Sequence, residues 1–163
     1  MDTTALRDAY RELLAAATTV AEGPTPALPA GEWDADRILA HVFIVGAETI
    51  AAVARVGSAT NTTYDNRSAQ DTWTLDRVST RAGGGAGLRE RVRAQGDALC
   101  ALGGSALGEA ELDTPVPALL LSNGAVLVDQ PLSLRDILAG LAEVELPGHT
   151  KQLLALLPDR AGA

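Results

Sequence analysis

Aliphatic side chains recur at helical spacing along four stretches of this chain. The stretches cover residues 3–21, 34–56, 86–102 and the region that opens at Ser133. Hydrophobic residues make up 47% of the chain, but aromatic residues only 3%. A core of Leu, Val, Ile and Ala favours closely packed helices over a β-sandwich, whose strands are enriched in aromatic residues. We therefore expect an all-α fold, a four-helix bundle, in a single domain over residues 1–163.

A different pattern separates the third and fourth helices. Two apolar runs, 116–121 and 125–128, flank Asn123-Gly124. Asn-Gly between apolar runs is the strongest short-range signal for a β-hairpin. We expect a small β-hairpin at 115–129, between helices three and four.

Residues 57–85 are harder to interpret. The segment 73–81 fits either a short helix or an ordered loop. The run Gly83-Gly84-Gly85 lacks the Lys-Ser/Thr of a phosphate-binding loop and no strand precedes it. It predicts a flexible connection and not a phosphate site.

The charge balance excludes several function classes. The formal net charge is −8, which gives no basic footprint for nucleic acid or for an anionic membrane surface. No stretch approaches the ~20 apolar residues of a membrane span, and the N-terminus lacks a signal-peptide pattern. Cys100 is the only cysteine, which fits a reducing compartment and a packing role. We expect a cytoplasmic protein that binds neither nucleic acid nor membranes.

The only two histidines lie on or beside apolar helical stripes. His41 lies in the second helix and His149 in the fourth, with Glu145 four residues earlier, so that Glu145 and His149 stack on one helix face. A buried carboxylate is costly unless it is paired or coordinated. Two imidazoles and a carboxylate are the ligands of several catalytic zinc sites. The same spacing also fits hydrogen-bonded core histidines and a solvated Glu145.

Other residues near these positions are weaker candidates. Gln152 lies one turn beyond His149, where it either orients the imidazole or is simply solvated. Trp73 and Asp71 are candidates for a cavity mouth, and Trp33 for packing at the start of the second helix. Three arginines either hold an acidic substrate or are solvated surface groups: Arg67, Arg77 and Arg81.

A proline interrupts the fourth helix within the candidate site. Pro147 precedes Gly148 between Glu145 and His149. Proline lacks a backbone N–H and crowds the preceding turn, so it predicts a kink or a new turn at about residue 146.

Two motifs resemble those of the DinB superfamily. Trp33 followed by Ile38-Leu39-Ala40-His41-Val42 is similar to its Trp-x4-Ile/Val-Leu-Ala-His-Leu signature, and 134–152 is similar to its last-helix motif. Glu145 in place of the usual first histidine resembles the branch of mycothiol-dependent maleylpyruvate isomerases. That resemblance implies a DinB-like bundle with a divalent metal, zinc first, or else nickel, iron or manganese, on His41, Glu145 and His149. The chain has no counterpart of the second domain that those isomerases carry.

The resemblance also implies an activity. In this branch the metal activates a low-molecular-weight thiol, which predicts a thiol transferase or isomerase with a small-molecule substrate, mycothiol as a candidate cofactor and a homodimer. Two alternatives stay open. One is a metal-dependent hydrolase that uses activated water, and the other is a non-catalytic, stress-associated metal-binding bundle.

Overall fold

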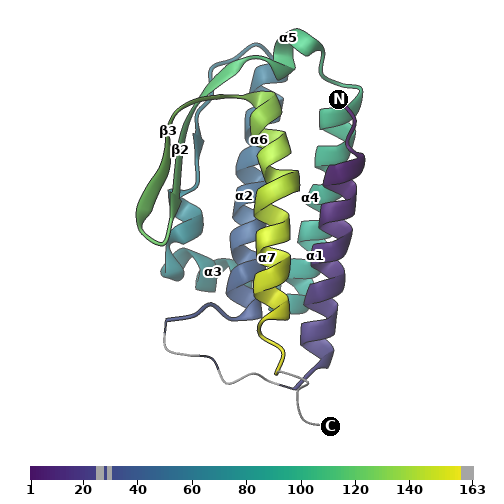
Figure 1. Cartoon of the computed structure of the whole chain (residues 1–163), viewed down its shortest axis with the longest axis vertical. Coiled ribbons are helices and arrows are strands. Elements are labelled where there is room, and N and C mark those ends of the chain that lie inside the picture. Colours follow the sequence, from purple (N-terminus) through teal and green to yellow (C-terminus); the bar gives the residue numbers. More distant parts are fainter. Residues whose placement is uncertain (25–27, 29–30, 159–163) are drawn as a thin grey trace.

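The protein is mostly helical and carries a small three-stranded sheet, in a computed structural model that describes residues 1–24, 28 and 31–158. The long helices α1 (Thr4–Glu22), α2 (Ala35–Gly57) and α4 (Gly85–Gly104) run alongside a C-terminal helical rod (Figure 1). That rod consists of α6 (Leu134–Gly140), η2 (Leu141–Glu145) and α7 (Leu146–Leu154). Shorter elements connect them: η1 (Arg67–Gln70), α3 (Thr72–Ala82) and α5 (Glu109–Leu112).

The core is aliphatic, as the composition predicts. α2 packs against α4, and α1 packs against α4 and α7. Large aliphatic side chains are fully buried in each long helix, among them Leu6, Leu13, Ile38, Leu39, Leu88, Leu99, Leu138 and Leu153. Burial of each such side chain stabilises the fold by about 1.5–3 kcal/mol before the entropy of ordering is subtracted.

One expectation about α2 needs correction. Contrary to the prediction that no stretch is apolar enough, α2 has the length and composition of a membrane span, and 61% of its most apolar window is buried inside the protein. The core helix of a soluble protein passes the same test. The high hydropathy of α2 therefore has a sufficient cause in its contacts with other helices.

Local capping signals set several helix starts. The Asp34 carboxylate accepts a hydrogen bond from the Arg37 amide at 2.8 Å, and Asp71 accepts one from the Thr74 amide at 2.9 Å. Ser133 accepts one from the Asp136 amide at 3.0 Å. Each side chain satisfies an N–H that the helix itself leaves unpaired. The second and fourth helices begin where these caps predict.

The predicted β-hairpin is present and is part of a sheet. β2 (Pro115–Ser122) pairs with β3 (Ala125–Ser133) in antiparallel register. Asn123 and Gly124 at its turn both have positive φ, as a two-residue turn of type I′ requires. β1 (Tyr64–Asp65) adds a parallel third strand on β2 that the sequence did not predict, so the fold is not purely all-α.

Two details position the hairpin. Leu120 pairs with Val128 but Leu121 pairs with Val126, which leaves Leu127 as the extra residue of a β-bulge. The Asn66 side-chain amide donates to the Leu121 carbonyl at 3.0 Å, and its oxygen accepts from the Leu121 N–H at 2.8 Å. These two hydrogen bonds join the segment after β1 to the hairpin.

The segment before α4 is more ordered than the sequence predicts. α3 forms over Thr72–Ala82, which settles the choice between a helix and a loop. Gly83 and Gly84 have φ of 85° and 77°, so they form a tight left-handed turn and not a loose connection. A Cβ on Gly87 would lie 1.8 Å from the Ala82 carbonyl oxygen, so this close crossing of α3 and α4 requires glycine.

Candidate metal centre

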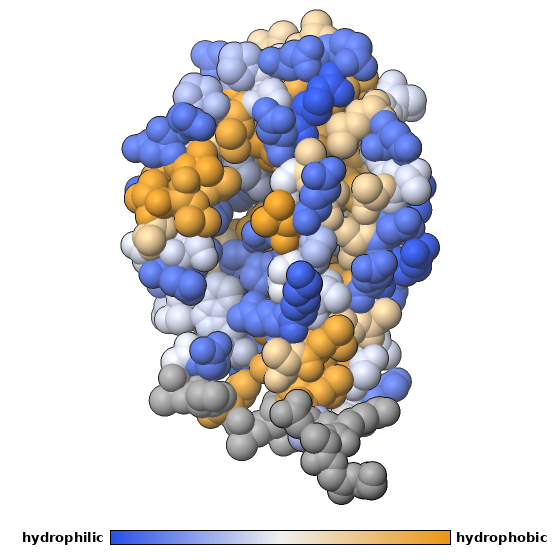
Figure 2. All heavy atoms as spheres, viewed as in Figure 1, coloured by the Kyte–Doolittle hydropathy of each residue, from blue (hydrophilic) through white to orange (hydrophobic). Residues whose placement is uncertain are grey.

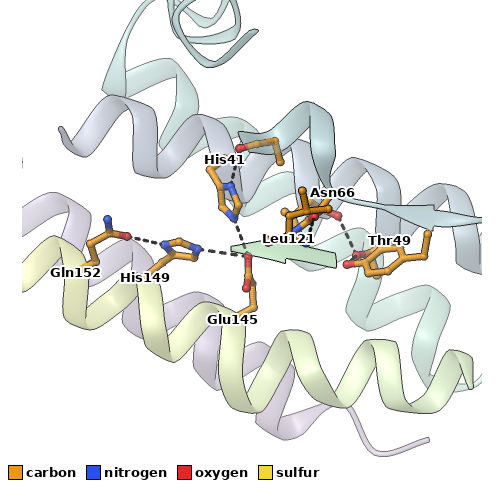
Figure 3. Close-up of polar contacts among 10 residues, drawn as sticks. His41, Thr49, Asn66, Leu121, Glu145, His149 and Gln152 are labelled. Atoms are coloured by element: carbon orange, nitrogen blue, oxygen red, sulfur yellow. Dashed lines mark hydrogen bonds and ion pairs between the residues drawn. The ribbon is translucent and has the colours of Figure 1, made fainter. Parts of the chain in front are cut away.

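His41 lies at the deepest point of the candidate site. It is on α2 and is only 2% exposed. Its Nδ1 lies 2.8 Å from the carbonyl oxygen of Ala69 in η1, and its Nε2 lies 2.7 Å from Oε1 of Glu145 (Figure 3). A carbonyl oxygen only accepts, so Nδ1 carries the proton and donates it. In the neutral ring, Nε2 is then a bare lone pair directed at Glu145.

The C-terminal rod supplies the other two groups. His149 Nε2 lies 3.3 Å from the same Oε1 of Glu145, and its Nδ1 donates to the Gln152 side-chain oxygen at 2.8 Å. The two imidazole centroids are 4.6 Å apart, and one ligand atom from each of the three residues lies within 4.8 Å of the others. The structure thus brings together the three residues that the sequence predicted. His41 and Glu145 are 104 positions apart along the chain.

The helix geometry around Pro147 explains how Glu145 reaches this position. A proline there cannot donate a backbone hydrogen bond, and its ring would crowd the carbonyl of residue 143 in a regular α-helix. Leu141–Glu145 instead forms a wider π-turn, and α7 begins at Leu146, where the sequence predicts a new turn. Such π-turns are frequent at functional sites. Here it ends at the carboxylate between the two imidazoles.

The donor set fits a divalent cation. With both Nδ1 atoms donating outward, neutral imidazoles present two bare nitrogens to a carboxylate, and none of the three groups has a proton to share. Either the rings gain protons or a cation lies among them. Outward Nδ1–H bonds to a carbonyl and an amide oxygen are the usual supports of metal-bound histidines. His41, Glu145 and His149 could therefore hold a metal ion.

Glu145 is ionised in this environment. Burial raises its pKa, but the influence of the two imidazoles that face it, His149 and His41, outweighs burial and leaves the pKa well below its usual range. Its side chain keeps 33% exposure, against 15% for His149. An anionic oxygen thus faces both imidazole nitrogens at the edge of the core.

The three residues border a cavity of about 760 Å³. The cavity lies between α2, the C-terminal rod and the β2–β3 hairpin, and a hollow is visible beside the hydrophobic side chains of the hairpin in Figure 2. Its volume is that of a small-molecule site. A cation on these three ligands would keep positions open toward this space, as catalytic sites do and sealed structural sites do not.

Two neighbouring predictions have clear outcomes. Gln152 lies in the cavity wall and orients His149, as one of its two interpretations predicts. Trp33 lies beside the site, with its ring 5.2 Å from that of His41, so it does more than pack at the helix start.

Trp73 is not a cavity residue. It is 65% exposed on α3 and stacks with the Arg77 guanidinium 5.1 Å from its ring centroid. Asp71 caps α3 instead of lining the cavity mouth. Leu75 and Val78, three residues apart, form the inward face of α3, and Trp73 lies off that face.

The three arginines considered for an acidic substrate lie elsewhere. Arg67 pairs with Asp65 at 2.6 Å, Arg77 covers Trp73, and Arg81 is not in the cavity wall. Cys100 is buried in α4 as a packing residue, and burial raises its pKa.

Four residues that contribute to the site were not predicted from the sequence. Ala69 anchors His41 through its backbone, and Tyr64, Asn66 and Gln70 line the cavity. All four lie in the polar 57–85 segment, where the sequence carries no periodicity. The only available signal was the short Thr63-Tyr64-Asp65 stretch before a turn-rich run.

Comparison with known proteins adds no relative: no protein-family model, no curated protein and no solved structure matches the chain.

Proposed function

We propose that this chain is a DinB-like four-helix bundle whose core metal centre activates a low-molecular-weight thiol for attack on an electrophilic small molecule. The observation that carries the proposal is the convergence of two anchored imidazoles and a carboxylate on the edge of a 760 Å³ cavity. The motifs around Trp33–His41 and 134–152 support the family, and α1, α2, α4 and the C-terminal rod are its four helices.

The ligands of the proposed centre are His41, Glu145 and His149. A divalent cation bound there supplies Lewis acidity, because it lowers the pKa of a thiol or water that binds it. Zinc fits this nitrogen and oxygen set, and nickel, iron and manganese remain candidates. Mycothiol is the candidate thiol by family resemblance.

The chain's own side chains hold this geometry. Ala69 fixes the tautomer of His41, and Gln152 fixes that of His149. Glu145 contributes one negative charge, which reduces the net charge of a divalent site to one. The buried face of α2 excludes water behind His41. When the thiol adds across a carbon–carbon double bond, the S–H bond and the π bond break. The sulfur bonds to one carbon and the proton moves to the other, so no oxidant or reductant is needed.

Metal content is the first test. Elemental mass spectrometry of tag-free protein should find about one equivalent of a divalent metal that is lost in His149→Ala. Lys151→Ala is the matched control, because Lys151 is exposed on the same turn and is outside the cluster. Absence of metal from the wild type, even after incubation with zinc, would overturn the proposal.

Turnover separates the alternatives. A panel of electrophiles with and without added thiol should show thiol-dependent consumption that requires His149. Turnover without thiol would identify a metal-dependent hydrolase instead. Metal binding with no turnover in either arm would identify a non-catalytic metal-binding bundle. A homodimer and a cytoplasmic location remain expectations of this proposal.

A further inference from the structure

We infer that the cavity takes an uncharged, largely apolar small molecule and rejects a carboxylate of the same shape. The inference rests on the proposed function only in taking this cavity as the substrate site. It deepens that function by assigning the chemical class of the substrate, which the metal ligands alone do not determine.

Apolar side chains line the cavity on two elements. The hairpin contributes Leu120, Leu127, Val128 and Leu132, and the C-terminal rod contributes Leu141 and Val144. Leu127 and Val144 are 67% and 70% exposed, so hydrophobic groups border the cavity on both of these elements. Exposed leucine and valine around a concave site are typical of apolar ligand recognition.

The β-bulge assigns Leu127 to this wall. Leu127 has no cross-strand partner because Leu121 pairs with Val126 and Leu120 with Val128. A bulge changes the direction of the side chain it carries. Leu127 lines the cavity, whereas its equally exposed neighbour Val126 does not.

Apart from the two imidazoles, which face Glu145, the charged side chains that line the cavity are all acidic. Glu32, Asp136 and Glu145 line it, and among the residues that the structure describes no arginine or lysine does so. A carboxylate that entered would meet like charges and lose water without a cationic partner from the protein. Uncharged polar groups, Gln70 and Tyr64 among them, remain available to a neutral ligand.

A pair of ligands that differ in one charge tests the inference. The probes are the methyl ester and the free acid of para-(mercaptomethyl)benzoic acid, which share a skeleton and a thiol. Each is titrated into metal-free and zinc-loaded full-length protein, and binding is followed by amide chemical shifts in nuclear magnetic resonance. We expect the ester to bind at least about tenfold more tightly than the acid to metal-free protein, with shifts at Leu127, Val128 and Val144. The ratio should be smaller in the zinc-loaded protein, because the proposed centre then carries a net positive charge.

A charge placed on the hairpin should reverse part of this preference. Leu127→Lys should improve acid binding by about two- to fivefold relative to the ester, the range of an exposed ion pair. Val126→Lys adds the same charge one residue away, outside the cavity wall, and should leave the ratio near the wild-type value. An equal change in both variants would point to a general field effect.

Each result decides the question. Equal or tighter binding of the acid by metal-free protein, or no binding of the ester in either form, overturns the inference. A zinc titration of the same sample by calorimetry decides the metal centre separately. Ester selectivity without zinc binding supports the substrate class and overturns the metal centre, whereas zinc binding without ester selectivity does the reverse.

Discussion

The two walls of the cavity differ in almost every physical property. The helical wall carries His41, Glu145 and His149, and the two imidazoles donate further hydrogen bonds to the oxygens of Ala69 and Gln152. The hairpin wall is apolar and exposed, and the Asn66 side chain bonds it to the segment after β1. In the proposed function the reactive groups thus lie on well-packed helices, where their geometry is fixed, and substrate recognition falls to a separate element.

The largest expected effect comes from the centre of the helical wall. Glu145→Gln removes the charge and the better oxygen ligand, so we expect zinc affinity to fall by more than about 100-fold, beyond the usual range for supporting residues. Calorimetric titration with zinc measures it. Glu143→Gln, two residues earlier on an exposed position, should bind zinc like the wild type.

Glu145→Gln also tests whether the two imidazole nitrogens that face residue 145 are hydrogen-bond acceptors in the metal-free protein. The introduced amide can donate to a bare imidazole nitrogen, which the carboxylate cannot do. Metal-free Glu145→Gln should therefore melt at a temperature equal to or above that of the metal-free wild type. A clear fall in that melting temperature would mean that the imidazoles are donors in the folded protein.

The next largest effect comes from Gln152, which contacts His149. Gln152→Ala removes the acceptor of the His149 Nδ1–H bond, and zinc affinity should fall by about 10–100-fold. Gln152→Glu keeps an acceptor oxygen at this place and should restore most of the affinity. If alanine and glutamate variants bind zinc equally, Gln152 does not position His149.

The hairpin wall responds to a different substitution. Asn66→Ala leaves the N–H and carbonyl of Leu121 without these two partners, and we expect a loss of about 1–3 kcal/mol in unfolding free energy. Amide hydrogen exchange at Leu121 should accelerate while zinc binding stays intact. Asn61→Ala, exposed in the same loop region, is the control. Reduced zinc affinity in Asn66→Ala would show that the two walls are coupled.

The contrast between the walls also explains what the sequence could predict. Helix starts and the hairpin turn depend on neighbouring residues, so Asp34, Ser133 and Asn123-Gly124 identify them directly. The candidate metal ligands could be predicted because buried histidine and glutamate are unusual on apolar stripes. β1 was missed because its two residues pair only with a strand more than fifty positions away, as Tyr64 with Ala118. Trp73 was placed wrongly because this large apolar side chain lies on the solvent side of α3, where Arg77 covers it.

The smallest effect compares the two tyrosines. Both are buried, but the Tyr64 hydroxyl bonds with Thr49 at 3.1 Å, whereas the Tyr10 hydroxyl has no hydrogen-bond partner among the described residues. Tyr64→Phe should cost about 1 kcal/mol, and Tyr10→Phe should be neutral or stabilising. Urea denaturation at neutral pH measures both. An equal cost would contradict the partner assignment at Tyr10.

The pH dependence of stability tests the same two tyrosines in a second way. Burial raises the pKa of Tyr64 to about 12, and the Thr49 hydrogen bond opposes only part of that rise. The folded state thus holds the phenol proton more tightly than the unfolded chain, whose tyrosines titrate near 10. The stability from this difference is complete below pH 10 and is lost as the pH rises toward 12. Tyr64→Phe should flatten that decline in urea denaturation, and the decline that remains should come from Tyr10 and Cys100, whose pKa values burial also raises.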